Sequence, residues 1–342
     1  MTFGRWLPRL VLAGAVLGCG APGYQGPTTP HFDGERFKNE ARIEQAGLLG
    51  VLKWQVTAKA VPWGPDREIT AAKPERNAPP GAVRVTFVNH ATVLVQVGTI
   101  NVLTDPVWSE RVGPLSFAGP QRHKGPGIRF QDLPPIDAVV ISHNHYDHCD
   151  FPTLRALAQA HHPVILGGLG TKAMLDDAGI PGGAEADWWQ SIDLPAQRGR
   201  ITITPSQHWS RRGFFDQNNT LWGSYMIEAD GKRVYFAGDT GYGAHFGAVA
   251  QKVGKPDVAL LPIGAYEPRW FMAPSHMAPR DAVQAHLDLG AKQSMGIHWG
   301  TFDLADEGQY EPVGQLGLSL DAQGLPRGAF VAPDNGGVLE VR

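Results

Sequence analysis

Apolar positions along the chain follow two spacings. From residue 83 onwards, short runs rich in β-branched residues alternate with polar or glycine breaks, and those at 83–88, 92–97 and 100–103 predict an antiparallel meander. Further strands are predicted at 138–141, 164–166, 201–204, 224–228, 233–237, 258–262 and 295–298. Helical spacing predicts helices at 153–161, 171–177 and 279–289. Strands in runs that then alternate with helices predict two helix-covered sheets, a layered α/β or α+β domain over residues 82–342.

The segment before this domain has a different pattern. Residues 44–56 place Leu48, Leu49, Leu52 and Val56 at helical spacing with Trp54 off that face, so we expect a short helix that covers the domain. Residues 62–81 hold five prolines and scattered charge, which is the composition of a linker. Residues 19–81 are therefore expected to form a tether and an N-terminal covering segment.

The first residues have the composition of an export leader. Two arginines precede an apolar stretch at 10–17, which is too short to span a bilayer, since that takes about 20 helical residues. Residues 16–19, VLGC, are similar to a bacterial lipobox, which implies a leader over residues 1–18 and a lipid on Cys19. The proline- and glycine-rich stretch at 21–30 fits a tether after such an anchor better than it fits a buried N-terminal helix. A cleaved signal peptide without lipid is the alternative, and both interpretations export the protein. Lipidation predicts anchoring to a membrane of the cell envelope, facing the periplasm.

Composition argues against two classes of protein, those that bind nucleic acid and those held together by disulfides. Lys and Arg number 30 against 33 Asp and Glu, so no basic excess exists to neutralise a nucleic-acid backbone, and a nucleic-acid partner is not expected. The two cysteines, Cys19 and Cys149, exclude a disulfide framework. Cys149 is expected to be a buried apolar filler.

Candidate chemistry is concentrated directly after the strand at 138–141. Four potential ligands follow within six positions: His143, His145, Asp147 and His148. Imidazole and carboxylate are groups that Zn²⁺ accepts, and four in one turn can begin two metal centres. Three later strand ends supply one donor each: His208, Asp239 and His298. Any one of these later residues alone is more typical of an ordinary turn, but together with the first cluster they make seven donors.

These residues resemble the metallo-β-lactamase superfamily, whose ordered motifs end its strands and gather metals at one rim of an αββα sandwich. The runs FVNHAT (87–92), LTDPVWS (103–109), GPQR (119–122) and especially GAYEPRWFM (264–272) resemble one branch more narrowly. That branch is the family of phospholipases D that hydrolyse N-acyl-phosphatidylethanolamine. The likeness runs from about residue 36 to the C-terminus, and it implies the αββα fold.

The resemblance also implies roles for individual residues. It implies two zinc ions with three ligands each and one bridging carboxylate: His143, His145 and His208 for the first ion, Asp147, His148 and His298 for the second, and Asp239 between them. Asp105 would steady the histidine loop, or else cap the turn before Pro106. His276 would act as a general acid or contact the substrate phosphate, or else have a structural role at a helix N-terminus. Trp270, Phe271 and Met272 would line an acyl groove or touch a bilayer, or else be ordinary core.

The implied function is that of a dinuclear zinc-dependent hydrolase. We expect a phosphodiesterase of the phospholipase D type, acting on N-acyl-phosphatidylethanolamine or a similar phospholipid through a metal-bridging hydroxide, with Asp147 and His276 as catalytic candidates. No Gly-x-Ser-x-Gly elbow suggests a serine nucleophile. A lactonase or amide hydrolase of the same fold, acting on another small ester or amide, is the first alternative, and a non-enzymatic metal-binding envelope lipoprotein is the second. The donor set also suits iron or manganese.

Overall fold

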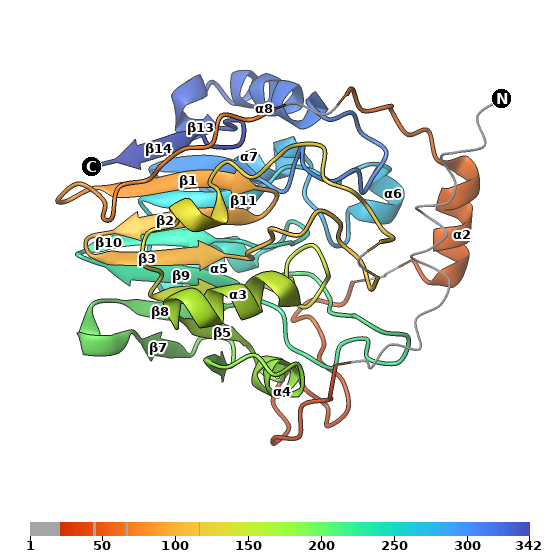
Figure 1. Ribbon diagram of the computed structural model, residues 1–342. Helices are drawn as coiled ribbons and strands as arrows, with labels where there is room; N and C mark the ends of the chain where they lie inside the picture. Colours follow the sequence, from red (N-terminus) through yellow and green to blue (C-terminus); the bar gives the residue numbers. More distant parts are fainter. Residues whose placement is uncertain (1–20, 44–45, 66–67, 116) are drawn as a thin grey trace.

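The computed structural model describes residues 21–43, 46–65, 68–115 and 117–342 (Figure 1). The leader predicted over residues 1–18 and the lipidation predicted at Cys19 lie outside the described residues.

Two mixed sheets of seven strands each form the centre of the molecule. The first has the order β14-β1-β2-β3-β4-β5-β6 and the second β13-β12-β11-β10-β9-β8-β7. The strands of the first sheet are β1 (Val83–Asn89), β2 (Thr92–Val97), β3 (Ile100–Thr104), β4 (Ala138–Val140), β5 (Val164–Gly168), β6 (Gly183–Ala186) and β14 (Val338–Val341). Those of the second are β7 (Ser191–Asp193), β8 (Arg200–Thr204), β9 (Ser224–Ala229), β10 (Lys232–Phe236), β11 (Val258–Pro262), β12 (Gln293–Ile297) and β13 (Phe330–Val331). The antiparallel pairing of β1 with β2 and of β2 with β3 confirms the predicted meander.

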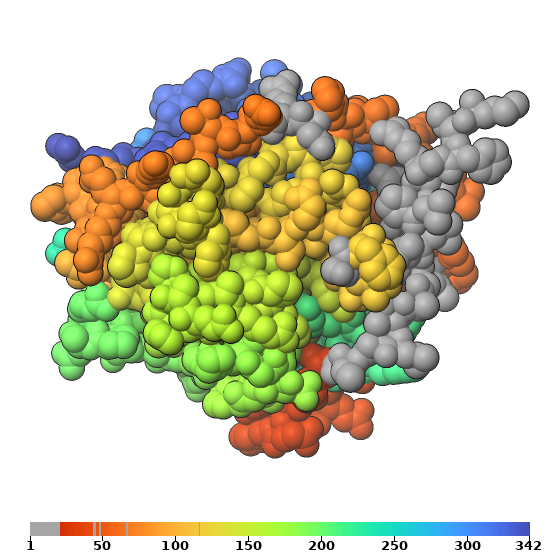
Figure 2. Space-filling view, in the orientation of Figure 1, coloured from red at the N-terminus to blue at the C-terminus, as the bar shows by residue number. Residues whose placement is uncertain are grey.

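Helices cover the outer faces of both sheets. The helices are α2 (Leu48–Thr57), α3 (Phe151–His161), α4 (Thr171–Asp177), α5 (His245–Lys252), α6 (Arg269–Met272), α7 (Pro279–Leu289) and α8 (Glu311–Ala322). In the space-filling view, the segment between β3 and β4, drawn in yellow, and α3, drawn in yellow-green, form much of the front surface (Figure 2). Leu154 and Leu157 of α3 pack on the outer face of the first sheet. Helices α5, α7 and α8 lie behind and above the second sheet (Figure 1). The predicted αββα architecture is confirmed.

Alternating side chains of the first sheet build two separate apolar layers. Val93 and Val95 of β2 point into the core between the sheets, whereas Leu94 packs with Leu154 and Leu157 of α3 on the outer side. Both faces of these strands are buried, which explains why they read as nearly continuous apolar runs. The rigid sandwich fixes the strand ends, and the candidate ligands follow those ends.

The predicted N-terminal helix forms, but its packing face was predicted wrongly. Leu49, Leu52 and Val56 of α2 are 83%, 48% and 83% exposed. Trp54, predicted to lie off the buried face, instead stacks on Phe271 with ring centroids 5.0 Å apart and donates from Nε1 to Asp306 Oδ1 at 3.1 Å. A large aromatic ring with a partner for its N–H gains more from burial than the smaller aliphatic side chains do, so the Trp54 side of the helix docks.

Among the described residues, none of the helices combines the length and the apolar character that crossing a bilayer requires.

Candidate metal centre

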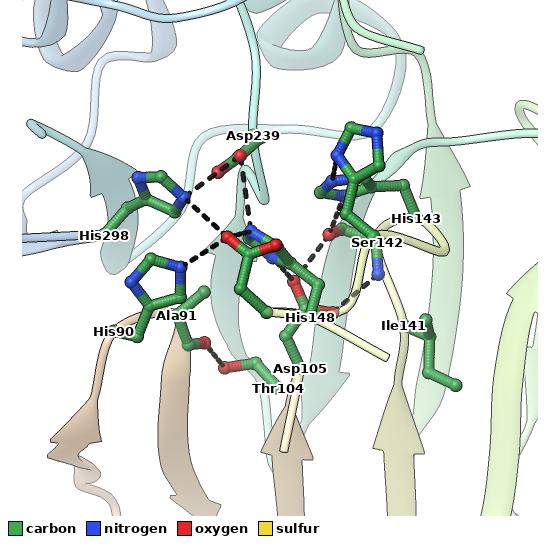
Figure 3. Close-up of polar contacts among 12 residues, drawn as sticks. His90, Ala91, Thr104, Asp105, Ile141, Ser142, His143, His148, Asp239 and His298 are labelled. Carbon is green, nitrogen blue, oxygen red and sulfur yellow. Dashed lines mark hydrogen bonds and ion pairs between the residues drawn. The ribbon is translucent and has the colours of Figure 1, made fainter. Parts of the chain in front are cut away.

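All seven predicted donors meet at one end of the sandwich, and both sheets contribute. His143 to His148 follow β4 of the first sheet, whereas His208, Asp239 and His298 follow β8, β10 and β12 of the second. The carboxyl ends of neighbouring parallel strands open at the same edge of a sheet, which is where such folds place their sites. The close-up shows three of these side chains, those of His148, Asp239 and His298, pointing toward one another (Figure 3).

Three histidines form the first group. His143 Nε2 lies 2.7 Å and His208 Nε2 lies 3.5 Å from His145 Nδ1. The other ring nitrogens of His143 and His208 are occupied, because Nδ1 of His143 is 2.9 Å from Ser142 Oγ and Nδ1 of His208 is 3.1 Å from the Ser275 carbonyl oxygen. These contacts fix the rings so that Nε2 of each faces the group, which is the arrangement a metal ligand needs.

An aspartate and two histidines form the second group. Asp147 Oδ2 lies 3.4 Å from His148 Nε2 and 3.7 Å from His298 Nε2. His148 Nδ1 donates to Asp105 Oδ2 at 2.6 Å, so Nε2 is the ring nitrogen that faces the site. The structure thus brings together the three residues that the resemblance assigned to the second ion.

Asp239 lies between the two groups. Its Oδ2 is 3.3 Å from His148 Nε2 and 3.1 Å from His298 Nε2 in the second group, and 4.0 Å from His208 Nε2 in the first. This is the position that a bridging carboxylate requires.

The residues fit a pair of metal ions. Five buried atoms of the seven donor residues lack a hydrogen bond in the described structure: His145 Nε2, His148 Nε2, His298 Nδ1, His298 Nε2 and Asp239 Oδ1. Buried polar atoms are rarely left without a partner, and those left here are imidazole nitrogens and a carboxylate oxygen, which are the donors that Zn²⁺ takes. His143, His145 and His208 would hold one ion and Asp147, His148 and His298 the other, with Asp239 shared.

Asp105 lies behind the histidine loop and is completely buried. Its Oδ1 accepts the Ser142 backbone N–H at 2.7 Å, and its Oδ2 accepts the Ser142 hydroxyl at 2.5 Å and His148 Nδ1–H at 2.6 Å. One carboxylate therefore fixes both the start of the loop and the tautomer of a ligand, which is more than capping the turn before Pro106 would need.

His90 is a member of the site to which the sequence analysis assigned no role. It lies in the turn between β1 and β2, and its Nε2 donates to Asp147 Oδ2 at 2.9 Å. Its carbonyl oxygen accepts the His298 backbone N–H at 2.6 Å, and the two rings are 4.1 Å apart. Residues 89–91 form the predicted break between two strands and lie in the FVNHAT run that resembles the family, but that run assigned His90 no chemical role. A histidine at the tip of a turn in the FVNHAT run was the available signal.

The backbone is strained at three residues of the site. His90, Asp105 and His298 have φ angles of 45°, 32° and 61°, which residues other than glycine rarely adopt. Such strain costs about 1–3 kcal/mol per residue and persists where the surrounding structure fixes it, commonly at functional sites.

Burial and neighbouring charges set the protonation of the donors. Burial lowers the pKa of His143, His145 and His208, that of His145 to about 4. Burial by itself raises the pKa of Asp147 and Asp239, but the imidazoles of His148 and His298 outweigh it and hold both pKa values well below the usual range. Neutral imidazoles and ionised carboxylates are the forms that bind metal.

His148 and His298 are the exceptions. Burial lowers their pKa, yet the surrounding carboxylates, Asp239 foremost, outweigh it. The pKa of His148 lies well above its usual value and that of His298 is raised to about 9. Both must release a proton before they can ligate a metal.

His276 lies beside the centre without belonging to either group of three. Its Nδ1 is 3.8 Å from Asp239 Oδ2, and its ring centroid is 5.2 Å from that of His208. Burial lowers the pKa of His276 to about 4, so its ring is neutral at pH 7. A neutral imidazole can donate a hydrogen bond but is a weak source of protons, which favours a substrate contact over a general acid.

The predicted apolar triplet forms α6 and divides into three environments. Met272 is buried with Ala265 and Ala305, and Phe271 is covered by Trp54. Trp270 is 45% exposed, with Lys53 Nζ 4.4 Å from its ring centroid. Of the three, only Trp270 presents a large surface to a substrate or bilayer.

Arg212 braces the histidine loop, and the sequence analysis did not single it out. Its Nη1 donates to the carbonyl oxygens of Asn144 at 2.9 Å and Cys149 at 2.8 Å. Its guanidinium lies 4.1 Å from the ring centroids of both Tyr146 and Phe151. Cys149 is fully buried as expected, and burial raises the pKa of its thiol to about 12.

The chain is similar to known proteins in both sequence and structure. A family profile described as a beta-lactamase superfamily domain matches residues 100–299, a segment that contains all seven donors but not His90. The N-acyl-phosphatidylethanolamine-hydrolyzing phospholipase D 1 of Caenorhabditis elegans is 38% identical over 266 residues, 75% of each chain. An uncharacterized protein of Mycobacterium tuberculosis is 39% identical over 276 residues, 78% of this chain and 72% of that one. Among solved structures, the metallo hydrolase Igni18 from Ignicoccus hospitalis superposes with a TM-score of 0.58 at 23% identity, covering 76% of this chain and 99% of that chain.

Proposed function

Because this chain belongs to the metallo-β-lactamase superfamily, in the branch of the N-acyl-phosphatidylethanolamine-hydrolysing phospholipases D, we propose that it is a dinuclear zinc phosphodiesterase that cleaves such a phospholipid. The chain is a metal-dependent hydrolase of this superfamily. The proposal goes further in two respects, the identity of the metal and the phospholipid substrate.

One observation carries the proposal of two ions. Asp239 Oδ2 lies within 3.1–4.0 Å of ligand nitrogens from both groups, so a single carboxylate can touch two neighbouring ions. The phospholipid substrate is supported by the 38% identity to the C. elegans phospholipase, which extends over 75% of each chain.

The chain's own residues position the reaction. When bound, the two ions would supply a water of lowered pKa and positive charge beside the oxygens of the phosphorus that is attacked. Asp105 and Ser142 hold the histidine loop in place, and His90 holds Asp147. His276, neutral at pH 7, offers an N–H to a phosphoryl oxygen of the substrate, and the exposed ring of Trp270 offers an apolar contact for an acyl chain.

The test is a comparison of electrophiles. Purified protein is loaded with zinc and assayed on vesicles of N-acyl-phosphatidylethanolamine, on phosphatidylethanolamine without the N-acyl group, and on simple lactones and amides. We expect phosphatidic acid and N-acyl-ethanolamine to be released. Faster hydrolysis of a lactone or amide than of any phospholipid contradicts the substrate proposal, and full turnover with iron or manganese but not zinc contradicts the proposed metal.

Asp239→Asn tests the bridging role. An amide cannot supply a shared negative charge to two cations, so we expect metal content to fall from two ions per chain to one or none. Turnover should fall by about 100- to 1,000-fold, on the scale of other catalytic electrostatic losses. Asp230→Asn, an exposed turn carboxylate, is the matched control. Unchanged metal content and rate in Asp239→Asn contradict the proposal.

We also propose that the protein is exported and anchored by a lipid on Cys19. Ala21, two positions after Cys19 in the chain, is buried and donates its backbone N–H to Asp216 Oδ2 at 2.8 Å. An anchor there would hold the folded domain near a membrane surface. Metabolic labelling with radioactive palmitate tests this proposal, since labelling should disappear in Cys19→Ala, and the absence of label in the unaltered protein contradicts it.

A further inference from the structure

Asn39, which precedes the two sheets in the chain, reaches the metal centre. Asn39 Nδ2 donates to the His208 carbonyl oxygen at 2.8 Å, and Asn39 Oδ1 accepts the His208 backbone N–H at 3.1 Å. A side-chain amide thus pairs with both polar groups of a ligand's backbone, as a neighbouring strand does in a sheet.

His208 needs such a partner because it lies beyond the end of β8 and is buried. Its Nδ1 is oriented by the Ser275 carbonyl oxygen, but this contact fixes only the ring. The backbone that carries the ring takes its hydrogen bonds, within the described residues, from Asn39. A buried N–H or C=O left unpaired is costly, so loss of Asn39 would let this backbone move.

The position of Asn39 is itself determined by its neighbours. Phe37 is buried against Phe32, with ring centroids 4.6 Å apart, and its backbone N–H donates to the Asn218 carbonyl oxygen at 2.9 Å. Asn39 Oδ1 also accepts Trp222 Nε1–H at 3.1 Å, from a tryptophan that is fully buried. The amide is therefore held in one orientation before any metal binds.

We propose that Asn39 is a positioning residue for the first metal ion, and that the N-terminal segment completes the active site by holding His208. The inference concerns the first group of ligands (His143, His145 and His208) and not the substrate. It is tested by zinc affinity alone, so it does not depend on whether the substrate is a phospholipid.

The test compares zinc affinity in three variants. Asn39→Ala removes the amide, and Asn39→Leu removes its hydrogen bonds while keeping its approximate shape. Asn219→Ala is the matched control, because Asn219 Nδ2 also fastens the N-terminal segment to the same loop, through the Ala21 carbonyl oxygen at 3.1 Å, without touching a ligand. Both zinc dissociation constants are measured by competition with a chromophoric chelator, and circular dichroism checks that each metal-free variant is folded.

We expect both Asn39 variants to bind one zinc ion about 10- to 100-fold more weakly, the usual cost of losing a group that orients a ligand. The second ion and the Asn219→Ala control should stay within twofold of the unaltered protein. Excess zinc should restore two ions per chain, which would not rescue a variant that had lost its fold. Unchanged constants in folded Asn39→Ala or Asn39→Leu overturn the proposal, as does an equal loss in Asn219→Ala. If Asn39→Ala does not fold, the zinc dissociation constants of Asn39→Leu are compared with those of the unaltered protein and of Asn219→Ala in the same way.

Discussion

The Asp147 carboxylate shows how single contacts tune this centre. One of its oxygens is held at 2.9 Å by His90, a residue from the β1–β2 turn, and the same oxygen faces His148 and His298. Groups that hold a ligand in this way usually contribute 10- to 100-fold to metal affinity.

His90→Ala should therefore lower the affinity for the second zinc ion about 10- to 100-fold and leave the affinity for the first nearly unchanged. His90→Gln, which keeps an N–H that can reach Asp147, should lose less. Chelator competition measures both dissociation constants. Two constants equal to those of the unaltered protein in His90→Ala show that His90 only packs against His298.

A pH dependence follows from the two protonated histidines. His148 and His298 have pKa values raised above 6.5, that of His298 to about 9, and each must lose its proton to ligate. Protons therefore compete with metal below these values, and zinc affinity should rise with pH between 6 and 8, by up to about tenfold per pH unit for each histidine that deprotonates.

Calorimetry in two buffers of different ionisation enthalpy measures the protons released as zinc binds. We expect between one and two protons per pair of ions at pH 7. Zinc affinity that does not change between pH 6 and 8, with no proton release, contradicts the raised pKa values of His148 and His298.

The sequence revealed the donors but not the residues that hold them. Each of the seven donors follows a strand that the apolar pattern predicts, so chemistry and position could be inferred together. Asn39 and Arg212 act through backbone carbonyls of residues 169, 68 and 63 positions away. Such contacts exist only once the sheets are packed. The family likeness begins at about residue 36 and so includes both residues, but it assigned a role to neither.

At the scale of elements, predictability followed length and apolar content. The long strands and α3, α4 and α7 were predicted within two residues or so, because five or more residues give a clear periodicity. The short edge strands β6 (GAEA), β7 (SID) and β13 (FV) have too few apolar residues to show one. Helix α8 contains Gly314 and Gly317, which weaken its helical signal, and it was missed as well.

Trp54 is the residue of helix α2 that packs most clearly on the domain. Trp54 stacks on Phe271 of α6 and donates to Asp306, whereas Leu49 and Val56 face outward. An aromatic pair contributes about 0.5–1.5 kcal/mol beyond its area and a hydrogen bond about as much. Trp54→Ala should therefore reduce the free energy that keeps α2 packed on the domain by about 1–3 kcal/mol.

Hydrogen exchange is the measurement for this prediction. Amides of residues 50–57 should exchange roughly 10- to 100-fold faster in Trp54→Ala, while those of β1 to β3 should be unchanged. Leu52→Ala, at a half-exposed position of the same helix, is the control and should change little. Equal protection of α2 in Trp54→Ala would mean that other contacts hold the helix.

For the whole molecule, the metal centre connects the two halves of the sandwich. The first group combines His143 and His145 from the first sheet with His208 from the second, and the second group combines Asp147 and His148 with His298 in the same way. Each bound ion would therefore cross-link the sheets at the edge where buried, strained and partly unpaired groups concentrate. Burying these polar groups without metal lowers the free energy of unfolding of the metal-free protein.

Removing metal should accordingly destabilise the entire domain. A ligand that binds only the folded state adds about 4 kcal/mol per site at 1,000 times its dissociation constant, and in a large domain each kcal/mol moves Tm by about 2–4 °C. Two sites saturated to this degree predict a Tm at least about 15 °C higher than that of chelator-treated protein, in a single cooperative transition. In Asp239→Asn the difference should be less than half as large, because the shared carboxylate is lost. Scanning calorimetry with and without zinc measures both values, and a shift below about 2 °C in the unaltered protein would mean that the ions do not join the sheets.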